Sequence, residues 1–551
     1  MDSEHVTSVE VLLDRARSLE EKIRELQEER ADCLRDVNAR RVATNVLPNE
    51  VLAAIFLAAS PPIDFDSMEF SIGVGDYCDE YVPTVEEMEV SRPEKEEDFS
   101  FRYFPLVVSA VCVMWRQVAL SMPQLWTSLS LKITHKSARH KTDLLQFYIE
   151  HSGDLPFSLG LDMWRYFAET QGIRCSCGSR MDKFPPDKIV LEPLRKVIFD
   201  DYVEKFQLLR LAHPPIEWAT LIPQRPFFAE DFAIGWSTVD CEQPIVDLGI
   251  PSSGSLRKLS FDSTWWSPIP TIPSSVTVVH LRAVDVRQAV RILFTCPQLV
   301  EYRYREPVNA VHPDNLEPPL NLQPLVLSNI RMFEWSWCDL PYHYDVTTIL
   351  RLPNVRHLRW SRLPQERLAN GRPSESRVQE FFTHLPEDLD TFEFYDMGGL
   401  LKDFTRVHKQ LLYHIFTHLS RIRTIGFIHC GPKFIDFFIS TFGHRTPTRN
   451  LMRNAVLGDL EQISIRDMGF PDWNYDPHTK VPPKYVVKEP FVRFMRAQAE
   501  FSKSRNLCIC LEGCLINCHH PYDDQLLYLQ QQKNFQLRYK TGGQVHSSAF
   551  P

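Results

Sequence analysis

Glycine is scarce in this sequence, with 20 residues in 551, whereas proline contributes 40. Scarce glycine disfavours glycine-rich loops that hold phosphate groups, because such loops need backbone conformations that other residues rarely adopt. The phosphate-binding loop, the Gly-x-Ser-x-Gly turn and the His-Glu-x-x-His helix are all missing. We therefore expect a protein that is not an enzyme and that carries no cofactor.

Long apolar runs are missing as well, and none approaches the roughly 20 residues that span a bilayer. The N-terminus is charged, so we expect no secretory signal. No strongly basic stretch is present, which argues against nucleic acid and membranes as partners. The 13 cysteines are odd in number and scattered, as is typical of free thiols in the cytoplasm or nucleus.

The net charge of −10 is concentrated in one segment. Residues 63–104 contain 13 acidic and 3 basic residues, a local net charge of −10, so the rest of the chain is close to neutral. This composition predicts a solvated, disordered loop. An acidic docking strip for a basic partner is the alternative.

Residues 9–37 have the spacing of a heptad helix. Apolar residues alternate steps of three and four, with one exception at Arg30. They are Val9, Leu12, Ala16, Leu19, Ile23, Leu26, Cys33 and Val37. About four heptads predict a short coiled coil that pairs with itself or with a partner helix. The alternative is an amphipathic helix that packs on its own protein or forms only in part.

Two further apolar helices are predicted. Residues 47–57 carry Pro48 at a position that suits the first turn of a helix, and they are apolar on most sides. After the acidic segment, helical spacing returns over residues 104–119, and residues 125–131 alternate like a strand. Helices this apolar must be covered on more than one face.

Beyond residue 250 an apolar pattern at i, i+3 and i+5 returns eight times at intervals of 20 to 38 residues. The triplets begin at Leu256, Val276, Leu299, Ile330, Val355, Leu389, Ile422 and Leu460. Helical stretches precede several of them, at 286–294, 377–385 and 409–419. A strand and a returning helix in each unit predict an α/β solenoid with a parallel sheet. An unrelated α/β domain with parallel strands is the alternative.

This solenoid makes two predictions about neighbouring residues. Leu358 should contact Phe333 and Phe392 in the core, whereas Arg359 should point to the exposed face of the sheet. The same outward face is predicted for Arg257, Arg303, Glu334, Glu393 and Arg466.

The two apolar helices together resemble the F-box. The matching stretches are Leu47-Pro48-x-Glu50-Val51-Leu52-x-x-Ile55-Phe56, Val111-Cys112-x-x-Trp115-Arg116-x-Val118-Ala119 and Pro123-x-Leu125-Trp126. The whole layout resembles the fungal F-box-like family. That resemblance implies a coiled-coil helix at 1–42, a three-helix F-box at 43–131 interrupted by the acidic insert at 63–104, and an irregular leucine-rich-repeat solenoid at 132–551.

The resemblance also implies a function, the substrate-recognition subunit of a Skp–cullin–F-box ubiquitin ligase. The box would bind the Skp adaptor, and through it a cullin, while the repeats bind an unidentified target protein. The implied adaptor-binding residues are Leu47, Pro48, Val51, Leu52, Ile55, Phe56, Val111, Cys112 and Trp115. Each of them is equally suited to the internal core of the box.

A cluster near the C-terminus offers different chemistry. Cys508, Cys510, Cys514, Cys518, His519 and His520 are types that bind Zn²⁺. Their spacing lacks the two-residue knuckle of common zinc modules, and the first two alternate with apolar residues as in a buried strand. We therefore expect no metal. A repeat-based interaction scaffold without a ligase role, with or without zinc at this cluster, remains the alternative function.

Overall fold

The structure, a computed structural model, forms two compact units. They are Met1–Pro215 with Phe227–Ala229, and Ile216–Pro226 with Glu230–Pro551. The described residues are 2–41, 47–61, 63, 65, 103–164, 166, 188–222, 229–236, 250, 254–262, 272–306, 324–336, 347–361, 375–397, 406–419, 421–443, 460–466, 507–512, 535–541 and 544–547. The acidic insert predicted at 63–104 lies outside them except at its ends.

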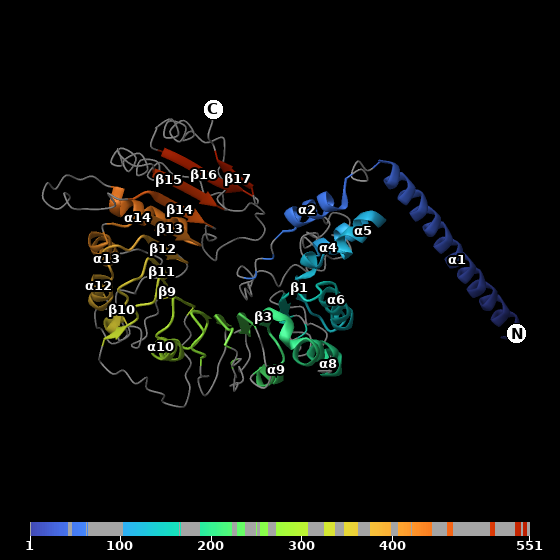
Figure 1. The fold of residues 1–551 in the computed structure, drawn as a ribbon, viewed down its shortest axis with the longest axis horizontal. Helices are drawn as coiled ribbons and strands as arrows, with labels where there is room; N and C mark the ends of the chain where they lie inside the picture. Colours follow the sequence, from blue (N-terminus) through green and yellow to red (C-terminus); the bar gives the residue numbers. More distant parts are fainter. Residues whose placement is uncertain are drawn as a thin grey trace. The chain divides into compact units, whose positions relative to one another are not determined.

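The first unit consists of helices and three strands that pair in parallel (Figure 1). Its elements are α1 (Asp2–Arg41), α2 (Asn49–Ala59), α4 (Phe104–Val111), α5 (Val113–Leu120), η3 (Pro123–Trp126), β1 (Ser128–Lys132), α6 (Ala138–His151), β2 (Phe157–Asp162), α8 (Lys188–Lys196), η4 (Val197–Asp201), η5 (Val203–Lys205) and β3 (Phe206–Ala212). The helix predicted over residues 9–37 is confirmed by α1. Trp126 is buried, and its Nε1 donates to the carbonyl of Ala119 at 2.8 Å.

The helix predicted over residues 104–119 is divided at Cys112. This residue has an extended backbone, with φ −157° and ψ 171°, and its Sγ accepts a hydrogen bond from the N–H of Trp115 at 3.4 Å. Cys112 thus caps α5 where α4 has ended. Arg116 Nε donates to the carbonyl of Ser109 at 2.9 Å and ties the two helices together.

The second unit is built on one large sheet. Its elements are α9 (Ile216–Leu221), β4 (Asp231–Gly235), β5 (Lys258–Asp262), β6 (Val278–Arg282), α10 (Val286–Thr295), β7 (Glu301–Arg305), β8 (Leu325–Val326), β9 (Met332–Ser336), β10 (Leu350–Arg351), β11 (His357–Ser361), α12 (Glu375–Thr383), β12 (Thr391–Tyr395), α13 (Arg406–His418), β13 (Thr424–Ile428), α14 (Pro432–Gly443), β14 (Gln462–Arg466), β15 (Leu507–Glu512), β16 (Phe535–Thr541) and β17 (Gln544–Ser547). The predicted helical stretches coincide with α10, α12 and α13.

From β4 to β16 the strands follow one another in chain order and pair in parallel. Two short strands, β8 and β10, pair separately, and β17 is antiparallel to β16. Helices α10, α12, α13 and α14 lie along one side of the sheet (Figure 1). The protein is therefore an α/β protein with a large parallel sheet, as the repeated pattern predicts at this level.

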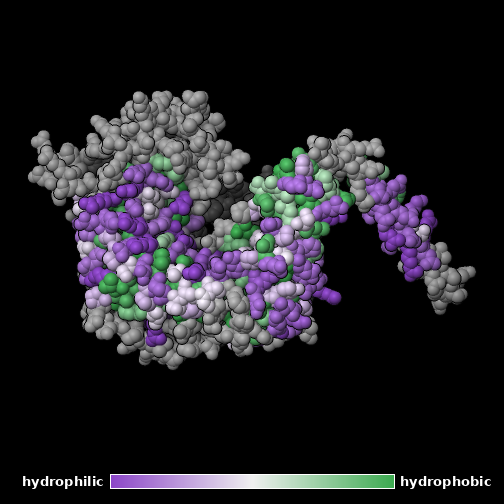
Figure 2. All heavy atoms as spheres, in the orientation of Figure 1, coloured by the Kyte–Doolittle hydropathy of each residue, from purple (hydrophilic) through white to green (hydrophobic). Residues whose placement is uncertain are grey.

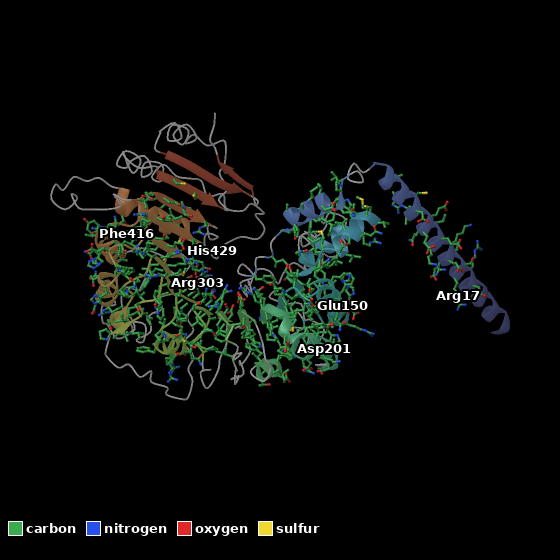
Figure 3. All side chains as sticks on the ribbon, viewed as in Figure 1. Arg17, Glu150, Asp201, Arg303, Phe416 and His429 are labelled. Carbon is green, nitrogen blue, oxygen red and sulfur yellow. The ribbon has the colours of Figure 1, made fainter. Side chains whose placement is uncertain are left out.

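All eight apolar triplets are buried. The register places Leu358 opposite Phe333 on one neighbouring strand and Phe392 on the other, as predicted. On the helix side, aromatic rings fill the space between the sheet and α12, α13 and α14. Phe416 of α13, for example, lies 5.5 Å from Phe392, measured between ring centroids (Figure 3).

Several strands end in the same unusual backbone conformation. Ala283, Glu306, Asp396 and His429 directly follow β6, β7, β12 and β13, and all have φ between 47° and 52°. In the first unit His213 does the same after β3, with φ 55°. Residues other than glycine seldom adopt this left-handed region. Its recurrence shows that the chain leaves these five strands by a similar turn.

Candidate protein-binding surfaces

The buried side of α2 forms the core of the short helices. Leu52 and Phe56 are buried, and the Phe56 ring meets the ring of Trp115 edge-on at 5.0 Å between centroids. Trp115 is half-buried, as are Leu47 and Cys112. Of the nine residues implied as adaptor contacts, Leu52 and Phe56 therefore serve the internal packing of these helices.

Three of the implied residues are large apolar side chains that remain exposed. Val51 and Ile55 lie one turn apart on α2, and Ile55 keeps 45% of its surface accessible. Val111 is exposed at the end of α4, and Pro48 is exposed ahead of α2. Exposed apolar residues on several neighbouring helices are typical of a protein–protein interface.

Sequence reasoning missed three further exposed residues on the same helices: Leu57, Val107 and Val113. Val107 precedes Val111 by one helical turn, so the sequence spacing could have predicted that both lie on the same side of the helix. Apolar colour gathers over α2, α4 and α5 (Figure 2). Among the described residues, large exposed apolar side chains outside these helices and α1 are limited to Ile216, Val300 and Val326.

The sheet face away from the helices carries charged side chains. At its centre, Glu334, Arg359 and Glu393 lie directly opposite one another on β9, β11 and β12. Arg359 joins the two carboxylates: its Nη1 lies 3.1 Å from Glu334 Oε2, and its Nη2 lies 2.6 Å from Glu393 Oε2. Arg359 also lies over the ring of Tyr395, 5.8 Å from its centroid.

The same kind of contact continues across much of the sheet. Within the described part of the chain, ion pairs between strands include Lys258–Asp231, Arg282–Asp262, His280–Glu301, Arg305–Glu334, Arg359–Glu334, Arg359–Glu393, His357–Glu393 and Arg466–Glu393. They connect β4 to β12 strand by strand, and the last reaches from β14 over β13. We call this set the charge ladder.

The predicted exposure of Arg359, Glu334 and Glu393 is wrong. Arg359 keeps 8% of its surface accessible, and both glutamates are buried. The physical reason is that neighbouring strands lie about 4.8 Å apart, so long side chains at the same register cover one another. Opposite charges make that contact favourable. Arg257 is exposed, and Arg303 and Arg466 are half-buried.

Two carboxylates of the charge ladder, Glu393 and Glu301, are held in the ionised form. Burial alone would raise the pKa of Glu393, but the hydrogen bond with His357 and the charge of Arg359 lower that pKa to about 2. Glu301 behaves alike: burial opposes ionisation, yet His280 and Arg303 lower its pKa to about 2. Both carboxylates are thus held by close partners on the sheet.

Gly426 makes room for the ladder on β13. A Cβ at this position would lie 2.7 Å from Cγ of Glu393, which is too close. The glycine lets the Glu393 side chain extend over β13, where Arg466 of β14 meets it.

We therefore expect Gly426→Ala to destabilise the sheet by about 1–3 kcal/mol, the usual cost of overpacking. The new methyl group must displace Glu393 from His357, Arg359 and Arg466. Gly254→Ala is the matched control, because no atom lies within 4 Å of a Cβ there. Chemical denaturation of both variants checks the prediction, and equal costs would contradict it.

The cysteine cluster lies only in part within the described residues. Cys508 and Cys510 are half-buried on β15, with 3.7 Å between their Sγ atoms, so their predicted place in a strand is confirmed. Cys514, Cys518, His519 and His520 lie outside the described residues. Within the described part of the chain, no three or more His, Cys, Asp or Glu residues are grouped to hold a metal ion. None of the described helices is long and apolar enough to cross a membrane.

No protein-family model matches this chain, and no curated protein matches it.

Proposed function

We propose that this protein is the substrate-recognition subunit of a Skp–cullin–F-box ubiquitin ligase. Helices α2, α4 and α5 would form the F-box, with Val51, Ile55 and Val111 facing the Skp adaptor. The observation that carries the proposal is the division of α2: Leu52 and Phe56 are buried, whereas Val51 and Ile55 are exposed. An apolar face that the unit leaves open is what an adaptor of complementary apolar surface requires.

The second part of the proposal is that the sheet of the second unit is an irregular leucine-rich-repeat solenoid that binds the target protein. Three observations support it. Strands follow in chain order, their buried triplets align in register, and several strands end in the same left-handed residue. Stacked units of this kind offer a long face to a protein partner.

The adaptor surface is tested by substitution of exposed residues alone. We expect the double variant Val51→Glu, Ile55→Glu to weaken binding of the full-length protein to a purified Skp adaptor more than about a hundredfold. Two charges would be placed against an apolar partner, while the buried Leu52 and Phe56 stay in place. Isothermal titration calorimetry measures the affinity, and thermal unfolding checks that the fold is unchanged.

Val326→Glu is the matched control, because Val326 is another exposed valine, located on β8 of the second unit. It should bind the adaptor like the natural sequence. Failure of the unaltered protein to bind any Skp adaptor would refute the ligase role. A role as an interaction scaffold without ligase activity would then be the better-supported function.

A further inference from the structure

Helix α1 presents an uncovered apolar stripe. It runs for 40 residues, and its described apolar side chains are half-exposed, between 43% and 56% of their surface. They are Leu19, Ile23, Leu26, Leu34 and Val37. A long helix in water gains most of its stability from packing of such a stripe. The stripe therefore needs an occupant.

Heptad positions identify what that occupant must look like. The stripe places Ile23 and Arg30 at a positions and Leu19, Leu26 and Cys33 at d positions. Apolar residues that repeat at a and d positions form the seam of a coiled coil. A polar residue at a single a position specifies the register of the pair, and the charges at e and g positions set its orientation.

We propose that α1 pairs with α1 of a second copy of this chain as an antiparallel two-stranded coiled coil. In this arrangement Ile23 of one copy faces Leu26 of the other, and Leu19 faces Arg30. The aliphatic part of Arg30 packs on leucine while its charge reaches the edge of the seam.

The charged and apolar residues that flank the seam favour the antiparallel orientation. Antiparallel pairing brings Lys22 beside Glu29 of the second copy, an attractive pair that occurs twice by symmetry. It also places Leu34 beside Leu13, so that an exposed apolar residue at the edge is covered.

A parallel pair in register fits less well. It would set Arg30 against Arg30 inside the seam, and Leu34 against Glu29 at its edge. Like charges in contact are destabilising, and a carboxylate beside leucine loses hydration without a partner. The occupant that fits is therefore a second copy in the opposite direction.

Sedimentation of the full-length protein tests self-association. We expect a mass of twice the 64.2 kDa of one chain. The double variant Leu19→Ser, Leu26→Ser should raise the dissociation constant of the dimer more than about a hundredfold, because each change removes two apolar contacts from a symmetric seam. The double variant Glu21→Ser, Glu28→Ser changes exposed residues on the opposite side of the helix and should stay dimeric. A monomeric natural protein, or a dimer that survives the leucine changes, would overturn the proposal.

Disulfide trapping tests the orientation. Antiparallel pairing sets position 16 opposite Cys33 of the second copy. Ala16→Cys should therefore form a disulfide between copies under mild oxidation, identified by mass spectrometry of the linked peptides. Within one helix these positions are about 25 Å apart, which excludes a bond inside the chain.

The control is Arg17→Cys. Arg17 lies off the seam and points into solvent, where it pairs with Asp14 at 3.2 Å (Figure 3). A thiol there should not link to Cys33. A disulfide between two Cys33 residues in the natural protein would indicate the parallel pair and overturn the proposed orientation.

Discussion

Glu393→Ala should lower the free energy of unfolding of the second unit by about 3–5 kcal/mol, the usual cost of removing one partner from a buried ion network. Glu393 accepts hydrogen bonds from His357 at 2.7 Å and from Arg359 at 2.6 Å, and it also pairs with Arg466. Its removal leaves these groups without their shared carboxylate. Hydrogen exchange of the strands β11 to β13 in the full-length protein measures the loss.

Glu387→Ala is the matched control. Glu387 is exposed and lies 3.9 Å from Arg421, an ion pair open to solvent. The same change of residue should cost no more than about 0.5 kcal/mol there. Similar costs at positions 387 and 393 would show that the charge ladder does not stabilise the sheet.

The ladder also makes stability depend on acid. The pKa of Glu393 is about 2 in the folded protein, below its ordinary value of 4.5, because His357 and Arg359 outweigh the effect of burial. A depressed folded pKa means that the stabilisation is complete above pH 4.5 and is lost as the pH falls towards 2. Glu393→Gln should therefore flatten the fall in stability over that window, as denaturation at a series of pH values would reveal.

The apolar part of this fold could be predicted from the sequence because its signal is local. Residues at i, i+3 and i+5 report one buried face of a short strand, and repetition of the triplet reports its neighbours. Leu358 between Phe333 and Phe392 follows from those two facts. Burial of apolar residues requires no knowledge of which charges meet.

The polar face could not be predicted in the same way. Arg359 was expected to be exposed on the outer face of the sheet. It is buried because Glu334 and Glu393 lie beside it at the same register on the two neighbouring strands. One feature of the sequence could have indicated the pairing: the sign of the charge alternates at equivalent positions of successive units, as between Arg303 and Glu334. Whether a charge is solvated or paired depends on strands 25 to 73 residues away in sequence.

The sequence could predict which residues belong to the apolar helices, but not which of them are buried and which are exposed. Residues of α2 are apolar on several sides, so the sequence does not distinguish core from surface. The contact between Phe56 and Trp115 decides it. No glycine or proline at Cys112 predicts the break between the two helices. Only the capping bond to the Trp115 N–H reveals why one predicted helix is two.

Phe394→Ala should cost about 3–5 kcal/mol, the range for deletion of a buried phenylalanine ring. Phe394 is fully buried on the helix side of β12, next to Glu393 in sequence but on the opposite face. Its ring lies 4.9 Å from Phe392, 5.0 Å from Phe434 and 5.7 Å from Phe427, between centroids. Loss of the ring opens a cavity shared by β12, β13 and α14.

Two comparisons separate cavity formation from a general effect of substitution. Phe394→Leu keeps most of the volume and should cost clearly less than Phe394→Ala, since the cost grows with the cavity left behind. Val300→Ala shortens an exposed valine and should change the free energy of unfolding by no more than about 0.5 kcal/mol. Unfolding of the three variants in denaturant ranks their losses in the free energy of unfolding. Equal costs for Phe394→Ala and Phe394→Leu would mean that the aromatic cluster is not closely packed and that the helices cover the sheet loosely.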